Sequence, residues 1–210
     1  MARDAASPSR FALPERVPQV VTRPLVITAA ATAAVVTIGA IDALLAARAW
    51  PVPVVGLFDE PAHLLTAAVL LAAVLPLRML PVVPWALAGS VLIDVDHVPL
   101  YLPGTALEHV DGRPITHSLA TVLFLVLSGS VARGRWRIAL LGLGTGVSLH
   151  LVRDLAAPLD GPGVRLLWPA LSNGVAMPYP SYSAVLVVAL MAIAGRQWRR
   201  SRQRRAWPAD

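Results

Sequence analysis

The stretch Leu25-Val-Ile-Thr-Ala-Ala-Ala-Thr-Ala-Ala-Val-Val-Thr-Ile-Gly-Ala-Ile-Asp-Ala-Leu-Leu-Ala-Ala47 decides the fold class. It contains one charged side chain, Asp42, and is otherwise made of apolar and small residues. A helix that crosses a lipid bilayer needs about 17 to 25 mostly apolar residues. The stretch therefore predicts a membrane-spanning helix.

The composition of the whole chain agrees with this prediction. Of the 210 residues, 56% are hydrophobic and 14% are charged, and the mean hydropathy is +0.65. Soluble domains carry about 25% charged residues, so an ordinary soluble globule and a disordered chain are both disfavoured. The sequence has no cysteine, which argues against a disulfide framework and a thiolate metal site.

Five further apolar stretches follow the first one. We expect an all-α, polytopic membrane helix bundle of about six transmembrane helices, at Leu25–Ala47, Pro61–Leu77, Pro81–Val98, His117–Ala132, Ile138–Ala156 and Ser181–Ala194. Pro61 suits the first turn of the second helix, where a proline is tolerated. The expected domains are a flexible cytoplasmic tail (1–24), a helical domain (25–197) and a basic cytoplasmic tail (198–210). A cleaved signal peptide is the alternative for the first span, but the apolar run is too long for one.

The arginines predict the orientation of the chain. All 18 basic residues are arginines, against 12 acidic residues, for a net charge of +6. Positively charged loops stay in the cytoplasm. With six spans, one side of the membrane holds most arginines and both termini: Arg3, Arg10, Arg16, Arg23, Arg78, Arg133, Arg135, Arg137, Arg196, Arg199, Arg200, Arg202, Arg204 and Arg205. We therefore expect a multi-pass membrane protein with both termini cytoplasmic, whose arginine tail contacts lipid headgroups rather than nucleic acid.

Polar residues within the spans gather at the opposite, extracytoplasmic end. Two pairs share a helix face by spacing, Asp94 with His97 and His150 with Asp154. Histidines and carboxylates in this arrangement bind zinc, manganese or similar divalent ions, and a polar helix end satisfied by water is the alternative. The expected ligands, for one ion or two ions, are His63, Asp94, His97, His117, His150 and Asp154. Asp42 lies near the same end and either pairs with an arginine or faces water.

Two glycines extend one of these faces along the fifth span. Gly142, Gly146, His150 and Asp154 follow one another at intervals of four residues, so they form one stripe on a helix. Small residues at this spacing let membrane helices pack closely. We expect the fifth helix to pack tightly at its middle and to present ligands at its end.

The ordered motifs resemble those of a known family. Gly89-Ser-Val-Leu-Ile-Asp-Val-Asp-His97 is similar to the Asp-x-Asp-His signature of the inner-membrane-associated, metal-dependent hydrolases, the YdjM-like family. Arg113-Pro-Ile-Thr-His-Ser118 resembles its Arg-x-x-Thr-His-Ser motif, and Ser148-Leu-His-Leu-Val-Arg-Asp154 its His-x-x-x-Asp motif. Asp59-Glu-Pro-Ala-His63 lies where the family has an early histidine. The chain departs from many relatives in having Gly112, rather than histidine, before the motif arginine.

The resemblance implies a metal-dependent hydrolase in the membrane. The expected position of the site, at the depth of the lipid headgroups, suits a lipid or a phosphoester as substrate. In this hypothesis Asp96 is a general base or orients a histidine ligand, and Arg113 holds a phosphate or carboxylate of the substrate. Two alternatives remain open. One is a transporter of metal ions or protons, and the other is a non-catalytic membrane protein with a structural metal. In each case membrane lipids are the expected partners.

Overall fold

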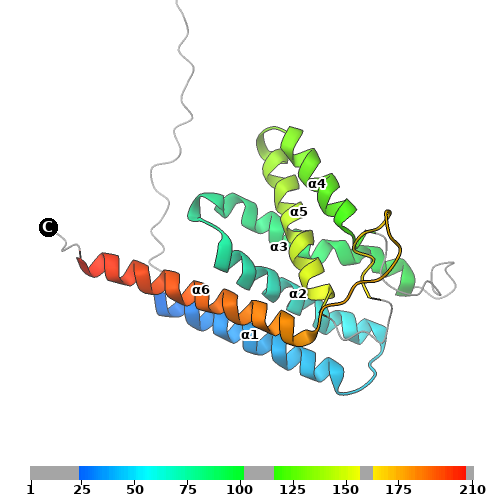
Figure 1. Cartoon of the computed structure of the whole chain (residues 1–210), viewed down its shortest axis with the longest axis horizontal. Coiled ribbons are helices and arrows are strands. Elements are labelled where there is room, and N and C mark those ends of the chain that lie inside the picture. The colour runs from blue at the N-terminus through cyan, green and yellow to red at the C-terminus, as the bar shows by residue number, and fades with distance from the viewer. Residues whose placement is uncertain (1–23, 102–115, 157–162, 207–210) are drawn as a thin grey trace, which may run out of the picture.

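The computed structural model describes residues 24–101, 116–156 and 163–206, and these are almost entirely helical (Figure 1). No β-strand occurs in these three segments, which contain one isolated bridge between Val164 and Val175. The all-α prediction is confirmed for this part of the chain. The helices are α1 (Pro24–Ala46), α2 (Val52–Val74), η1 (Leu77–Val82), α3 (Val83–Leu92), η2 (Ile93–Tyr101), α4 (Leu119–Val131), α5 (Gly134–Asp154) and α6 (Tyr179–Ala206), where η marks a 3-10 helix.

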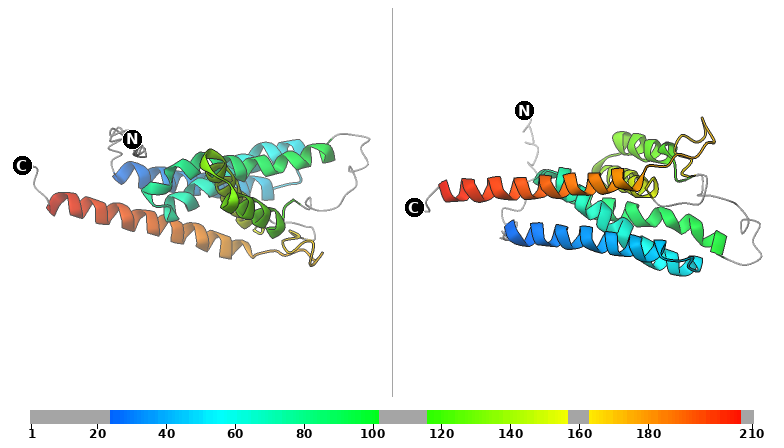
Figure 2. Two further views of the ribbon diagram at one scale, coloured as in Figure 1. Left: turned by 90° about the horizontal axis from the view of Figure 1, so that it is seen from above. Right: turned by 60° about the horizontal axis from the view of Figure 1, so that its bottom comes forward.

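The helices pack in two sets that meet at α2. Helix α1 packs against α2 and α6, while α5 lies between α3 and α4 and also contacts α2. Figure 1 shows α1 and α6 running side by side, with the hairpin of α4 and α5 inclined to them. In both Figure 1 and Figure 2 the start of α1 and the end of α6 lie at the same end of the bundle.

Four helical stretches are long and apolar enough to cross a membrane. They are Leu25–Ala46, Pro53–Val74, Met79–His97 and Tyr179–Gln203. These stretches correspond to the first, second, third and sixth expected spans. Helix α4 has 13 residues, and α5 carries arginines near both ends, so neither belongs to this set. The crossing of the membrane by α4 and α5 stays a prediction.

The predicted start of the second helix is wrong. Helix α2 begins at Val52, and Pro53 rather than Pro61 occupies its first turn. Pro61 lies inside the helix, although a proline there removes one backbone hydrogen bond. The earlier start places Asp59 on the same helix as His63, one turn before it.

The third and sixth spans also differ from the expected ranges. The third is α-helical only up to Leu92 and continues as the 3-10 helix η2, in which residues three apart lie above one another. This geometry aligns Asp94 with His97. Helix α6 continues through the basic segment to Ala206, well beyond Ala194.

The glycine stripe of α5 packs against α3, as its spacing predicts. A Cβ atom at Gly142 would collide with Trp85 and Val82, and one at Gly146 with the backbone of Ala86 and Ser90. Only glycine therefore allows this approach. The contact brings the carbonyl oxygen of Ser90 within 2.9 Å of His150 Nδ1.

We predict that Gly146→Ala lowers the free energy of unfolding by about 1–3 kcal/mol, because the added methyl group meets backbone atoms that cannot rotate away. The matched control is Gly39→Ala in α1, where a Cβ would meet no atom within 4 Å. This control should be neutral or slightly stabilising, since alanine favours a helix over glycine. Unfolding of the purified protein in detergent measures both effects. Equal stabilities would contradict the close packing of α3 on α5.

Candidate metal centre

Four elements bring the candidate ligands together beside the middle of α2. The prediction that His63 lies at the end of its span is wrong, because α2 begins at Val52 and His63 lies midway along the apolar stretch Pro53–Val74. His63 comes from α2, the Asp94-Val-Asp-His97 segment forms part of η2, His117 precedes α4, and His150 and Asp154 end α5. The structure brings all six predicted ligands, together with Asp96, into two adjoining groups of possible metal-binding side chains. In Figure 1 the end of α5 lies beside the start of α6, away from the end of α6 that carries the arginines.

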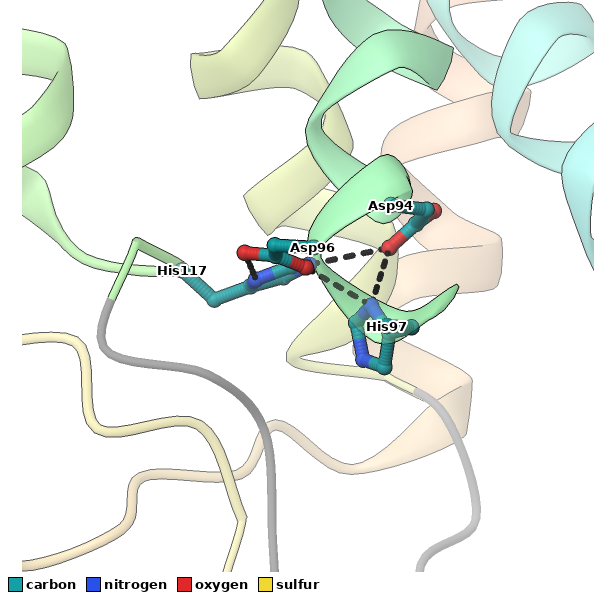
Figure 3. Close-up of side chains that lie close together, drawn as sticks. All are labelled: Asp94, Asp96, His97 and His117. Carbon is teal, nitrogen blue, oxygen red and sulfur yellow. Dashed lines mark hydrogen bonds and ion pairs between the residues drawn. The ribbon is translucent and has the colours of Figure 1, made fainter. Parts of the chain in front are cut away.

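The first group, which we call the outer group, consists of Asp94, Asp96, His97 and His117 (Figure 3). His97 Nδ1 lies 3.2 Å from Asp94 Oδ1 and 3.0 Å from Asp96 Oδ1. His117 Nε2 lies 3.0 Å from Asp94 Oδ1, and its Nδ1 lies 3.5 Å from Asp96 Oδ2. Asp96 also accepts a hydrogen bond from the Thr116 hydroxyl.

The second group, which we call the inner group, consists of His63, His150 and Asp154. Each of these residues is at most 1% exposed. The two imidazole rings stack with their centroids 3.8 Å apart. His63 Nε2 lies 3.4 Å from Asp154 Oδ1, and His150 Nε2 lies 3.1 Å from Asp154 Oδ2. The carboxylate of Asp154 therefore reaches both histidines, one with each oxygen.

The two groups adjoin through Asp94. Its Oδ1 atom lies 3.0 Å from His117 Nε2 in the outer group and 3.5 Å from His150 Nε2 in the inner group. A second link is the 3.8 Å separation between His117 Nε2 and Asp154 Oδ2. The outer and inner groups are therefore in direct contact with each other.

The protonation of His150 fits a cation bound to the inner group. Its Nδ1 must donate the hydrogen bond to the Ser90 carbonyl oxygen, because a carbonyl only accepts. In the neutral ring, Nε2 then has a free lone pair, and this atom faces the carboxylates of Asp94 and Asp154. A proton on Nε2 or a metal cation between these atoms removes the repulsion between their lone pairs. Histidines that bind metals typically donate their other ring N–H to a carbonyl oxygen in this way.

Other buried nitrogen atoms support the same interpretation. Within the described part of the chain, no hydrogen bond is formed by either ring nitrogen of His63, by Nδ1 of His117 or by Nε2 of His150. Buried polar atoms without hydrogen bonds are costly, so a native structure provides them with a partner. Imidazole nitrogens and carboxylate oxygens suit zinc, manganese or a related divalent ion. The residues therefore fit a metal, and the donor types alone do not select one.

A buried charge network lies beside the inner group. The Arg153 guanidinium donates hydrogen bonds to Asp59 Oδ1, at 2.7 Å from Nη2 and 3.2 Å from Nε, and to Asp42 Oδ1 at 2.7 Å. Its Nη1 also donates to the Tyr182 hydroxyl at 3.4 Å, and Tyr179 donates to Asp42. The network joins α1, α2, α5 and α6. It answers the open question about Asp42, which pairs with an arginine.

Asp59 connects this network to the candidate metal ligands. Its Oδ2 atom lies 3.4 Å from His63 Nε2, while its Oδ1 atom binds Arg153. The sequence analysis missed Asp59 and Arg153 as parts of the site. One signal pointed to Arg153, because it precedes Asp154 in the His-x-x-x-Asp motif.

Arg113 lies in residues 102–115, outside the described part of the chain. Its role as an anion-binding residue stays a prediction. Asp96, by contrast, belongs to the outer group, so the geometry is compatible with a ligand as well as with a base.

We predict that Arg153→Ala lowers the free energy of unfolding by about 3–5 kcal/mol, because it leaves the carboxylates of Asp42 and Asp59 without their cation. The control Arg199→Ala removes an exposed guanidinium and should change stability by no more than about 0.5 kcal/mol. Chemical denaturation in detergent would measure both. A small effect at Arg153 would mean that the network does not hold the helices together.

The comparison with protein families agrees with the motifs. A family model described as "YdjM inner membrane protein" matches residues 59–209, which include every candidate ligand. No curated protein and no solved structure gives a significant match. The match covers more than half of the chain, and the chain therefore belongs to the YdjM inner membrane protein family.

Proposed function

We propose that the protein is a membrane-embedded, metal-dependent hydrolase that acts on a phosphoester at the depth of the lipid headgroups. The observation that carries the proposal is the convergence of His63, His150 and Asp154, all at most 1% exposed, with the carboxylate of Asp94, which lies 3.5 Å from His150 Nε2. A divalent cation supplies Lewis acidity to such a site, since it polarises an ester oxygen and lowers the pKa of water bound to it.

The exposure of the outer group supports a route for substrate and water. The side chains of Asp94 and His97 are each 15% exposed and that of Asp96 is 24% exposed, whereas those of His150 and Asp154 are fully buried. Asp96 is thus the most accessible carboxylate of the two groups. In our proposal it accepts the proton of the attacking water, and its contacts with Thr116 and His97 hold it in place.

The remaining roles follow from charge and position. Arg113 would hold an anionic group of the substrate, because a guanidinium binds phosphate with paired hydrogen bonds. The inner-membrane family and the apolar helices support access to lipids. An active site on the extracytoplasmic side, with both termini in the cytoplasm, completes the proposal. Its support is the arginine distribution of the sequence.

The alternative of ion transport has less support from the position of the groups. Transport sites usually lie near the middle of the bilayer, at broken helices of repeated halves. Here Asp94, Asp96 and His97 end the third apolar stretch and His150 and Asp154 end α5, although His63 lies midway along the stretch Pro53–Val74. Ion flux in liposomes that contain the protein, without hydrolysis of any lipid, would favour transport over our proposal.

We predict that His117→Ala and Asp154→Ala remove bound metal and lower phosphoester hydrolysis by more than about a hundredfold. Loss of outer-shell partners alone costs 10- to 100-fold, and these residues are direct ligands in the proposal. Elemental analysis of the purified variants and a panel of lipid and soluble phosphoesters would measure the two effects.

The matched control is Thr145→Ala on α5, whose hydroxyl donates a hydrogen bond to the Leu141 carbonyl oxygen one turn earlier in the same helix. This variant should keep both metal and hydrolysis. Full retention of metal by both His117→Ala and Asp154→Ala, in folded protein, would defeat the proposed site. A wild-type protein that holds metal but hydrolyses no member of the panel would defeat the proposed activity.

A further inference from the structure

The two groups together contain seven possible ligand residues, more than one zinc or manganese ion coordinates. Donor atoms of one zinc or manganese ion lie about 2.0–2.2 Å from it, so any two of them lie within about 4.4 Å of each other. In the described chain, possible donor atoms gather within 4.8 Å of one another in two separate groups, one of four residues and one of three. Each group thus offers three or four protein donors, the number that one zinc ion takes from protein in catalytic or structural sites.

The two groups are too close to act independently. The Oδ1 atom of Asp94 lies within 3.5 Å of a ring nitrogen in each group. One carboxylate can therefore serve both groups. In the inner group, buried ring nitrogens of His63 and His150 form no hydrogen bond. A cation bound to the inner group would give these nitrogens a partner, whether or not the outer group also binds one.

We propose that the centre holds two divalent cations that share Asp94. His63, His150 and Asp154 hold the inner ion, and Asp94, His97 and His117 hold the outer ion, beside which Asp96 stays available as the base. This inference rests on the proposed function and narrows its substrate class to phosphate esters. Paired ions stabilise both the attacking and the leaving oxygen of a displacement at phosphorus.

The burial of the ligands gives the two ions different accessibility. The side chains of the inner group are at most 1% exposed. The carboxylates of the outer group are 15% to 24% exposed. A chelator or a competing ion in solution should therefore reach the outer ion first. The outer ion should also be the one that faces the substrate.

The experiment measures metal content and its rate of loss in the full chain, purified in detergent and loaded with Zn²⁺ or with Mn²⁺. We expect two ions per chain at saturation, and two kinetic phases when a chelator is added. His97→Ala should hold one ion and lose the fast phase. His63→Ala should hold one ion and lose the slow phase. In the Mn²⁺ form, the electron paramagnetic resonance spectrum should show two coupled ions, and each variant should show the spectrum of an isolated ion.

Thr145→Ala is again the matched control, because its side chain lies on α5 but belongs to neither group. It should keep two ions and both phases. The wild-type stoichiometry decides the question even where a variant fails to fold. One ion per folded wild-type chain would overturn the paired centre and leave the proposed hydrolase standing. No bound ion would overturn both, whereas two ions without phosphoester hydrolysis would overturn the proposed function alone.

Discussion

The hydrogen bond from His150 Nδ1 to the carbonyl oxygen of Ser90 joins α5 to α3 and fixes the chemistry of the candidate metal centre. It forms because Gly142 and Gly146 let the two helix backbones approach more closely than any side chain would allow. The same bond orients the imidazole ring, so that its Nε2 atom faces the carboxylates of Asp94 and Asp154. The glycine stripe therefore has two effects: it allows α5 to pack closely on α3, and it allows Ser90 to orient the ring of His150.

A second constraint acts on the other side of the inner group. Arg153 lies between Asp42 and Asp59, and this pairing offsets the cost of removing its charge from water. Arg153 on α5 pairs with Asp59 on α2, so the network holds these two helices together. Asp59 also contacts His63, which links the network to the inner group. The inner group is thus supported from α3 through Ser90 and from α1 and α6 through Arg153. Such support keeps buried ligands in place without a flexible loop.

The sequence predicted the convergence of the candidate ligands because depth in a membrane follows from span order and loop charge. Spacing also predicted which face of α5 packs and which residues it presents. The predicted start of α2 was wrong because Pro61 was assumed to lie in the first turn of the helix. Pro53 occupies that turn instead, and Pro61 lies inside the helix. The pairing of Arg153 with Asp42 links residues 111 positions apart, which no local pattern specifies. The division of the donors into two groups depends on side-chain directions in η2, where the helix tightens after Leu92.

Helix α6 begins beside the charge network, at Tyr179, and carries its first arginine at Arg196. The apolar residues between these points span about 26 Å at 1.5 Å per residue, close to the roughly 30 Å hydrocarbon thickness of a bilayer. The helix then continues with basic residues to Ala206, and Arg202 stacks on Trp198 at 3.9 Å. The length of this apolar segment therefore determines the distance between the basic end of α6 and the charge network beside the inner group. A mismatch between the length of this apolar segment and the bilayer thickness would consequently change the depth of the candidate metal centre. The length of the lipid acyl chains would then change the hydration of the outer group.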